Sequence, residues 1–80
     1  MDDGTTTGTD ELDLRGLRCP LPALHLRRAL ARSAPGRILT LRCTDPLAGL
    51  DIPNLLRETG DALLGAARDG TETRFTVRKS

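Results

Sequence analysis

The spacing of apolar residues changes period along the first half of this chain. Over residues 11–15, Leu12 and Leu14 alternate with charged residues, which predicts a short half-buried strand. Over residues 20–33 the apolar positions form a stripe along one side of a helix, and the Pro-Gly pair at 35–36 ends that pattern. The chain therefore begins with a predicted strand followed by an amphipathic helix.

Residues 37–44 return to clear alternation. Leu39, Leu41 and Cys43 share one face, and mostly polar residues share the other. This pattern is typical of a strand in a sheet that has helices on one face and water on the other. We therefore expect a second strand here, with Cys43 as a buried core residue.

The second half of the chain predicts one helix and a hairpin. Asp51 precedes Pro53, and an acid ahead of an early proline marks the start of a helix. We therefore place the helix at about 51–59, with Gly60 ending it. Residues 62–68 have the propensity of a helix, but the Asp-Gly pair at 69–70 is a strong hairpin turn and residues 71–79 alternate. Because a hairpin requires a preceding strand, we expect residues 62–68 to be a strand.

These elements follow one another in the order β-α-β-α-β-β. We expect an α/β two-layer sandwich, in which two helices cover one face of a four-stranded mixed sheet. Residues 1–10 contain no apolar residue after Met1 and are predicted to be a disordered acidic N-terminal tail. Residues 11–80 form a single domain, and 38% hydrophobic with 29% charged residues is the composition of an ordinary globular domain.

Charge and aromatic content argue against two classes of function. The net charge is +1, so no global field draws the chain to nucleic acid or to a membrane. One Phe, no Trp and no Tyr provide too few aromatic side chains for stacking bases. No apolar run approaches the length of a membrane span, and the acidic N-terminus has no signal-peptide pattern. We expect a cytoplasmic monomer that binds neither membranes nor nucleic acid directly.

The chain has two cysteines, Cys19 and Cys43, and one histidine, His25. Two cysteines do not form a disulfide framework, and they indicate a reducing compartment. Three ligands fall short of the four in a structural zinc site, so we expect no metal. His25 lies about 240° around the helix from its start, so we interpret it as a surface residue rather than a catalytic partner of Cys19.

The segment from Arg15 to Pro22, with the sequence RGLRCPLP, joins the first strand to the first helix. Pro20 suits the first helical position, because an N–H at that position would have no acceptor within the helix. Cys19 then becomes the N-cap residue. The positive end of the helix dipole and the nearby Arg15 and Arg18 would then favour the thiolate over the thiol. The position predicts a reactive cysteine.

The prolines limit this activation, because they remove two amide donors. Only the N–H groups of Leu21 and Ala23 remain to donate to a Cys19 thiolate, so we expect a moderately activated sulfur. In the alternative interpretation Cys19 is a small buried hydrophobe that precedes a helix. For Cys43, the alternative to a core position is that it resolves a disulfide with Cys19.

Four motifs occur in order along the chain. They are Leu12-Asp13-Leu14-Arg15-Gly16-Leu17-Arg18-Cys19-Pro20-Leu21-Pro22, Thr44-Asp45-Pro46, Asp51-Ile52-Pro53 and Phe75-Thr76-Val77-Arg78-Lys79. Together they resemble the TusA/SirA-like sulfur-carrier proteins, over residues 12–79. The fold of that family is the two-layer sandwich predicted above.

The resemblance implies that Cys19 accepts a persulfide from a cysteine desulfurase or a rhodanese-like donor and relays the sulfur to a downstream acceptor protein. Family members serve tRNA thiolation, molybdenum-cofactor synthesis or sulfur oxidation. Such a sulfurtransferase needs no cofactor beyond the covalent persulfide on Cys19, and needs no general base if the thiolate is already formed. No such base is evident in the sequence. The chain has Leu55 and Leu56 where relatives often have an aromatic residue or a second cysteine.

Further residues are candidates for supporting roles. We predict that the geometry of the Cys19 site depends on Gly16, Arg18, Pro20 and Pro22, and that partner proteins dock on Arg27, Arg28 and Asp45. In the simpler interpretation the arginines are a solvated helix face, and Asp45 and Asp51 are helix caps. The alternative function is a non-enzymatic adaptor or regulatory domain with a structural cysteine.

Overall fold

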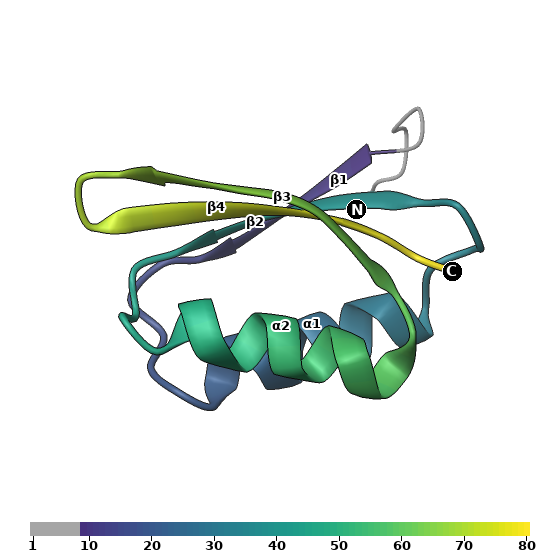
Figure 1. Ribbon diagram of the computed structural model, residues 1–80, viewed down its shortest axis with the longest axis horizontal. Coiled ribbons are helices and arrows are strands. Elements are labelled where there is room, and N and C mark those ends of the chain that lie inside the picture. Colours follow the sequence, from purple (N-terminus) through teal and green to yellow (C-terminus); the bar gives the residue numbers. More distant parts are fainter. Residues whose placement is uncertain (1–8) are drawn as a thin grey trace.

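The computed structural model describes residues 9–80, and its elements follow the expected order β-α-β-α-β-β (Figure 1). The predicted N-terminal tail lies, as far as residue 8, outside the described residues. The strands are β1 (Thr9–Leu14), β2 (Ile38–Cys43), β3 (Ala62–Asp69) and β4 (Glu72–Arg78), and the helices are α1 (Leu21–Ala31) and α2 (Ala48–Thr59).

The four strands form one mixed sheet in the order β1-β2-β4-β3. β1 and β2 are parallel neighbours connected through α1, whereas β4 pairs antiparallel with both β2 and β3. Both helices lie against the same face of the sheet, as Figure 1 shows. The predicted two-layer α/β sandwich is confirmed.

The hydrophobic core lies between the helices and this face of the sheet. Leu39, Leu41 and Cys43 are all buried, which confirms the alternation predicted for β2. Beside them in register stand Phe75 and Val77 of β4. The helices complete the core with Leu26, Leu30, Ile52, Leu55 and Leu56. Because burial of each large apolar side chain is worth about 1.5–3 kcal/mol, this core fixes the helices against the sheet.

The predicted boundaries of two elements were wrong. β1 begins at Thr9 rather than at residue 11, and Asp10 is accommodated in this edge strand by an ion pair with Arg37 at 2.9 Å. α2 begins at Ala48 rather than at about residue 51, because the Asp-Pro pair at 45–46 starts it. Asp51 therefore belongs to the first turn of α2 and is not its cap.

The end of α2 and the hairpin agree with the sequence predictions. Gly60 has the left-handed φ of 84°, and its N–H donates to the carbonyl of Leu56 at 2.9 Å. Residues 62–68 are extended, and Gly70 turns the chain with a φ of 64°. β3 is an edge strand whose residues are almost all exposed, so no buried face imposes alternation on its sequence.

Candidate functional site

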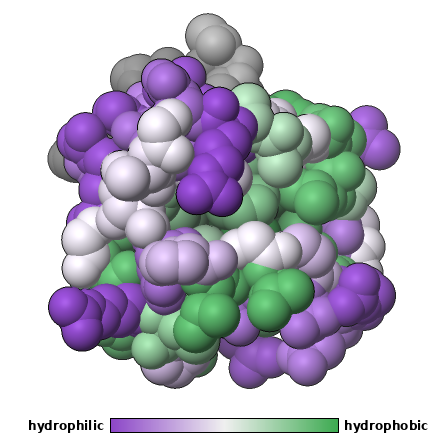
Figure 2. All heavy atoms as spheres, turned by 60° about the vertical axis from the view of Figure 1, so that its left-hand side comes forward, coloured by the Kyte–Doolittle hydropathy of each residue, from purple (hydrophilic) through white to green (hydrophobic). Residues whose placement is uncertain are grey.

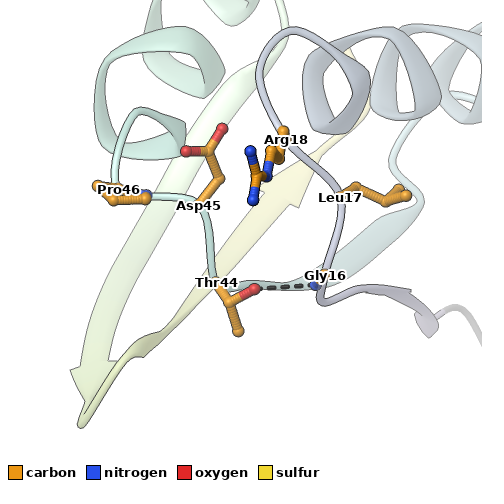
Figure 3. Close-up of a pocket in the computed structure, with 6 residues that line it drawn as sticks. All are labelled: Gly16, Leu17, Arg18, Thr44, Asp45 and Pro46. Carbon is orange, nitrogen blue, oxygen red and sulfur yellow. Dashed lines mark hydrogen bonds between the residues drawn. The ribbon is translucent and has the colours of Figure 1, made fainter.

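Two loops meet at one end of the molecule and form the candidate site. Because β1 and β2 are parallel neighbours, the loops that follow them, residues 15–20 and 44–47, emerge at the same edge of the sheet. The N–H of Gly16 donates to the Thr44 hydroxyl at 2.9 Å and joins the two loops (Figure 3). Gly16 has a φ of 84°, which explains why a glycine stands there.

Cys19 lies exposed in the first loop, and its backbone is held by the second. Its N–H donates to Oδ2 of Asp45, and the other carboxylate oxygen of Asp45 accepts the N–H of Leu47 at 3.2 Å. Both oxygens of Asp45 are thus occupied by backbone donors. Asp45 fixes the start of α2, in the manner of a cap, and fixes the position of Cys19 at the same time.

The prediction that Cys19 is the N-cap residue of α1 was wrong. α1 begins at Leu21 with Pro20 as its N-cap, and the Cys19–Pro20 peptide bond is cis. The N–H of Leu21 donates to the carbonyl of Arg18 at 2.8 Å, so it is not available to the thiol. Pro22 is the second residue of α1 and is buried, so it packs into the molecule rather than facing Cys19.

The predicted activation of the thiol is also contradicted. A hydrogen bond with Asp51 raises the pKa of Cys19 to about 11, together with partial removal of solvent and the negative charges of Asp51 and Asp45. A carboxylate that accepts from the thiol and carries a negative charge disfavours the thiolate. The thiol is therefore favoured over the thiolate, and the carboxylate that contributes most to this comes from the other helix.

The two arginines expected to stabilise a thiolate are directed elsewhere. Arg15 donates to both carboxylate oxygens of Asp13, with two contacts of 2.8 Å, and this hydrogen bonding holds the pKa of Asp13 well below its usual range. The guanidinium of Arg18 reaches into the pocket between the loops, on the side of Asp45 (Figure 3). The charges that act on the thiol are those of Asp51 and Asp45.

The residues before and after Cys19 in the sequence line two separate depressions. One has a volume of about 500 Å³ and lies between the loops, where it is lined by Gly16, Leu17, Arg18, Thr44, Asp45 and Pro46. The other has a volume of about 230 Å³ and lies between the helices, where it is lined by Pro20, Ala23, Leu24, Arg27, Asp51, Asn54, Leu55 and Glu58. Arg18 and Pro20, on either side of Cys19 in the sequence, thus line two different depressions.

Exposed leucines follow both loops of the site in the chain. The first turn of α1 carries Leu21 and Leu24, and the start of α2 carries Leu47 and Leu50, of which Leu50 is 64% exposed. Figure 2 shows apolar side chains in patches among polar ones on this side of the molecule. We call these four residues the leucine rim. Apolar side chains gathered around an exposed cysteine are typical of a surface that another protein covers.

The other predicted docking residues lie along α1. Arg27 forms an ion pair with Glu58 of α2 at 3.2 Å, and both side chains are largely exposed. Arg28 lies on the α1 surface next to His25 and near the leucine rim. An exposed ion pair contributes little to stability, so Arg27 remains available to a partner.

Cys43 is buried, whereas Cys19 is exposed. Cys43 is 1% exposed and packs in the core, where burial raises its pKa to about 11. Both cysteines are free thiols. Among residues 9–80, no three His, Cys, Asp or Glu side chains gather to hold a metal ion. Within the same residues, neither helix is long and apolar enough to cross a membrane.

The fold and the site define a small α/β sandwich that presents one exposed cysteine from a fixed loop. The family model described as "Sulfurtransferase TusA" matches residues 10–79. The sulfur carrier protein TusA of Allochromatium vinosum is 34% identical over 70 residues, which cover 88% of this chain and 92% of the relative. The chain therefore belongs to the TusA family of sulfur carrier proteins.

A solved structure supports the fold independently of sequence. The SirA-like protein of Desulfitobacterium hafniense superposes with a TM-score of 0.75, at 18% sequence identity, over 86% of this chain and 95% of that protein. At this level of identity the likeness concerns the architecture, the order β-α-β-α-β-β with two helices on one face.

Asp51 is the residue of this site that sequence reasoning missed. The sequence indicates a helix cap at Asp51, whereas in the structure this residue contributes most to raising the pKa of the Cys19 thiol. The signal was present in the Asp-Ile-Pro motif at 51–53, but nothing local connects that motif to a cysteine earlier in the chain.

Proposed function

We propose that Cys19 is the residue on which this sulfur carrier holds its sulfur, as a covalent persulfide, and that the protein acts as a sulfurtransferase. The donor is a cysteine desulfurase or a rhodanese-like protein in the cytoplasm, and the sulfur passes to a downstream acceptor protein. The carrier needs no other cofactor and no metal for this exchange, since one sulfur–sulfur bond replaces another.

The observation that carries this proposal is the contrast between the two cysteines. Cys19 is exposed in a loop whose backbone is held by Asp45, whereas Cys43 is sealed in the core. Sulfur exchange between proteins requires a sulfur atom that enters a partner's active site, because the attacking and leaving atoms must align. Cys19 meets that requirement, and Cys43 does not.

The surface around Cys19 supports docking of protein partners. The leucine rim provides apolar area, and Arg27 and Arg28 provide positive charge at its border. We propose that donor and acceptor use this surface in turn, with Asp45 holding the loop during both encounters. A monomer suffices for such a cycle.

The experiment is intact-mass spectrometry of the purified protein after incubation with a cysteine desulfurase and free cysteine. We expect one added sulfur, removed by a reductant and absent from Cys19→Ser. Cys43→Ser is the matched control and should still gain one sulfur. An unmodified wild-type protein, or sulfur found on Cys43, would overturn the assignment.

A further inference from the structure

The guanidinium of Arg18 points into the pocket between the two loops without a protein partner. Figure 3 shows its direction, and the pocket has a volume of about 500 Å³. The side chain makes no hydrogen bond and no ion pair with any residue that the structure describes. Arg15, Arg27 and Arg42, by contrast, each pair with a carboxylate. The unused N–H donors of Arg18 can therefore receive an anion in this pocket.

The other polar side chains that line this pocket are already engaged. Both carboxylate oxygens of Asp45 accept backbone N–H groups, and the hydroxyl of Thr44 accepts another. The side chains of Leu17 and Pro46, which also line the pocket, are apolar. The polar groups of the pocket thus hold the two loops together, and the guanidinium of Arg18 remains for another molecule.

Arg18 directly precedes Cys19, so a protein that encloses the Cys19 sulfur also covers Arg18. Both residues are exposed, and consecutive Cα atoms across a trans peptide lie about 3.8 Å apart. The function proposed for Cys19 requires its sulfur to enter a partner's active site. Removing the charge of Arg18 from water in that complex is unfavourable unless the partner provides an acceptor. We therefore expect the partner surface to carry an acceptor opposite Arg18.

A carboxylate is the acceptor that fits this position best. Its two oxygens match the fork of a guanidinium and accept two parallel N–H···O hydrogen bonds. It carries one negative charge, whereas a phosphate monoester carries about −1.5 to −2 at neutral pH. The carboxylate of Asp45 lies on the same side of the pocket (Figure 3) and repels the larger charge more strongly. The pocket therefore favours an Asp or Glu side chain over a phosphate group.

We propose that Arg18 anchors the sulfur donor by binding an Asp or Glu carboxylate of that protein in the pocket between the loops, an inference that rests on the proposed function of Cys19. The contact fixes the donor beside Cys19 and takes no part in the exchange of sulfur itself. Arg18 thus selects donors that present an acidic group at this point. Because its side chain is exposed and bonded to no described residue, its removal should leave the fold unchanged.

The test measures the rate of persulfide formation on Cys19 against carrier concentration, with a cysteine desulfurase and free cysteine. For Arg18→Ala we expect the KM for the carrier to rise about tenfold, as for loss of one charge-assisted hydrogen bond, while kcat stays near the wild-type value. Arg18→Glu should raise KM further, because two carboxylates then face each other, and Arg18→Lys should restore part of the affinity. Arg32→Ala, at the opposite end of α1, is the matched control and should behave as wild type.

Salt dependence makes the test specific to charge. The difference in KM between wild type and Arg18→Ala should shrink as ionic strength rises, because salt screens the contact. Equal KM values for these two proteins, Arg18→Glu no weaker than Arg18→Ala, or a loss confined to kcat would overturn the proposal. Saturable binding of inorganic sulfate at micromolar concentrations, seen by NMR in wild type and absent from Arg18→Ala, would make a small anion the occupant and overturn it as well. Wild-type protein that gains no sulfur would instead overturn the function of Cys19, and this inference with it.

Discussion

The backbone N–H of Cys19 donates to the carboxylate of Asp45, a residue 26 positions further along the chain. The loop that carries Cys19 is therefore held by the loop after β2. The Gly16–Thr44 hydrogen bond of 2.9 Å joins the same two loops. The parallel pairing of β1 and β2 brings them together.

Loss of the Asp45 carboxylate should affect stability and sulfur transfer together. In Asp45→Ala the N–H groups of Cys19 and Leu47 lose their acceptor, so we expect unfolding free energy to fall by about 1–2 kcal/mol. The loosened loop should slow persulfide formation. Thermal melts and the desulfurase assay measure the two effects. A variant that melts and reacts as wild type would show that this contact does not hold the loop.

Replacement of Cys43 should affect stability alone. Cys43→Ala removes a buried sulfur from the core and should cost about 1–2 kcal/mol. Sulfur acceptance at Cys19 should remain nearly intact, because Cys43 does not reach the surface. Loss of persulfide formation in a Cys43→Ala protein with a normal melting curve would show that this residue takes part in the relay.

Pro22 should act by rigidity and packing rather than by tuning the thiol. It is buried at the second position of α1, so Pro22→Ala loosens the start of the helix and removes packed atoms. We expect slower transfer from the desulfurase while the pKa of Cys19 stays level or falls. The alkylation rate of Cys19 is measured against pH, together with the rate of sulfur transfer. This separates an effect on the pKa of the thiol from an effect on transfer. Undiminished transfer together with a lower pKa would contradict this role.

The reactivity of Cys19 should keep rising with pH well beyond neutrality. Because its hydrogen bond with Asp51 raises the pKa of Cys19 to about 11, the alkylation rate should still increase above pH 9. An ordinary cysteine would level off earlier, since its pKa is about 8.5. The Cys43→Ala protein is the suitable background, because it contains one thiol. A plateau below pH 8 would show an activated thiol instead.

Glu72 should stabilise the fold at neutral pH and less in acid. Arg42 donates to both of its carboxylate oxygens, at 2.8 and 3.1 Å, and this hydrogen bonding lowers the pKa of Glu72. A depressed pKa contributes stability that is present above the unfolded-state pKa and is lost as pH falls through the folded-state value. The difference in melting temperature between wild type and Glu72→Gln should therefore narrow from pH 7 to pH 3. A difference independent of pH would refute this linkage.

The order of the elements and most of the core were determined by the sequence alone. The alternation of Leu39, Leu41 and Cys43 predicted a strand with one buried face, and Gly60 marked the end of a helix. The Asp-Gly pair at 69–70 predicted a hairpin although residues 62–68 resemble a helix. These features depend on side-chain period and turn chemistry, which act over a few neighbouring residues.

Only the tertiary structure decided the chemistry of Cys19. Local reasoning predicts a thiol at a helix dipole between two arginines, but Arg15 pairs with Asp13, and the carboxylates of Asp51 and Asp45 raise the pKa of Cys19 instead. The positions of these carboxylates depend on where α2 begins and on how the loop before it lies against the loop that holds Cys19. Electrostatic effects act through space and change sign with the nearest charge, so a thiol's pKa is set by residues that the sequence does not place beside it.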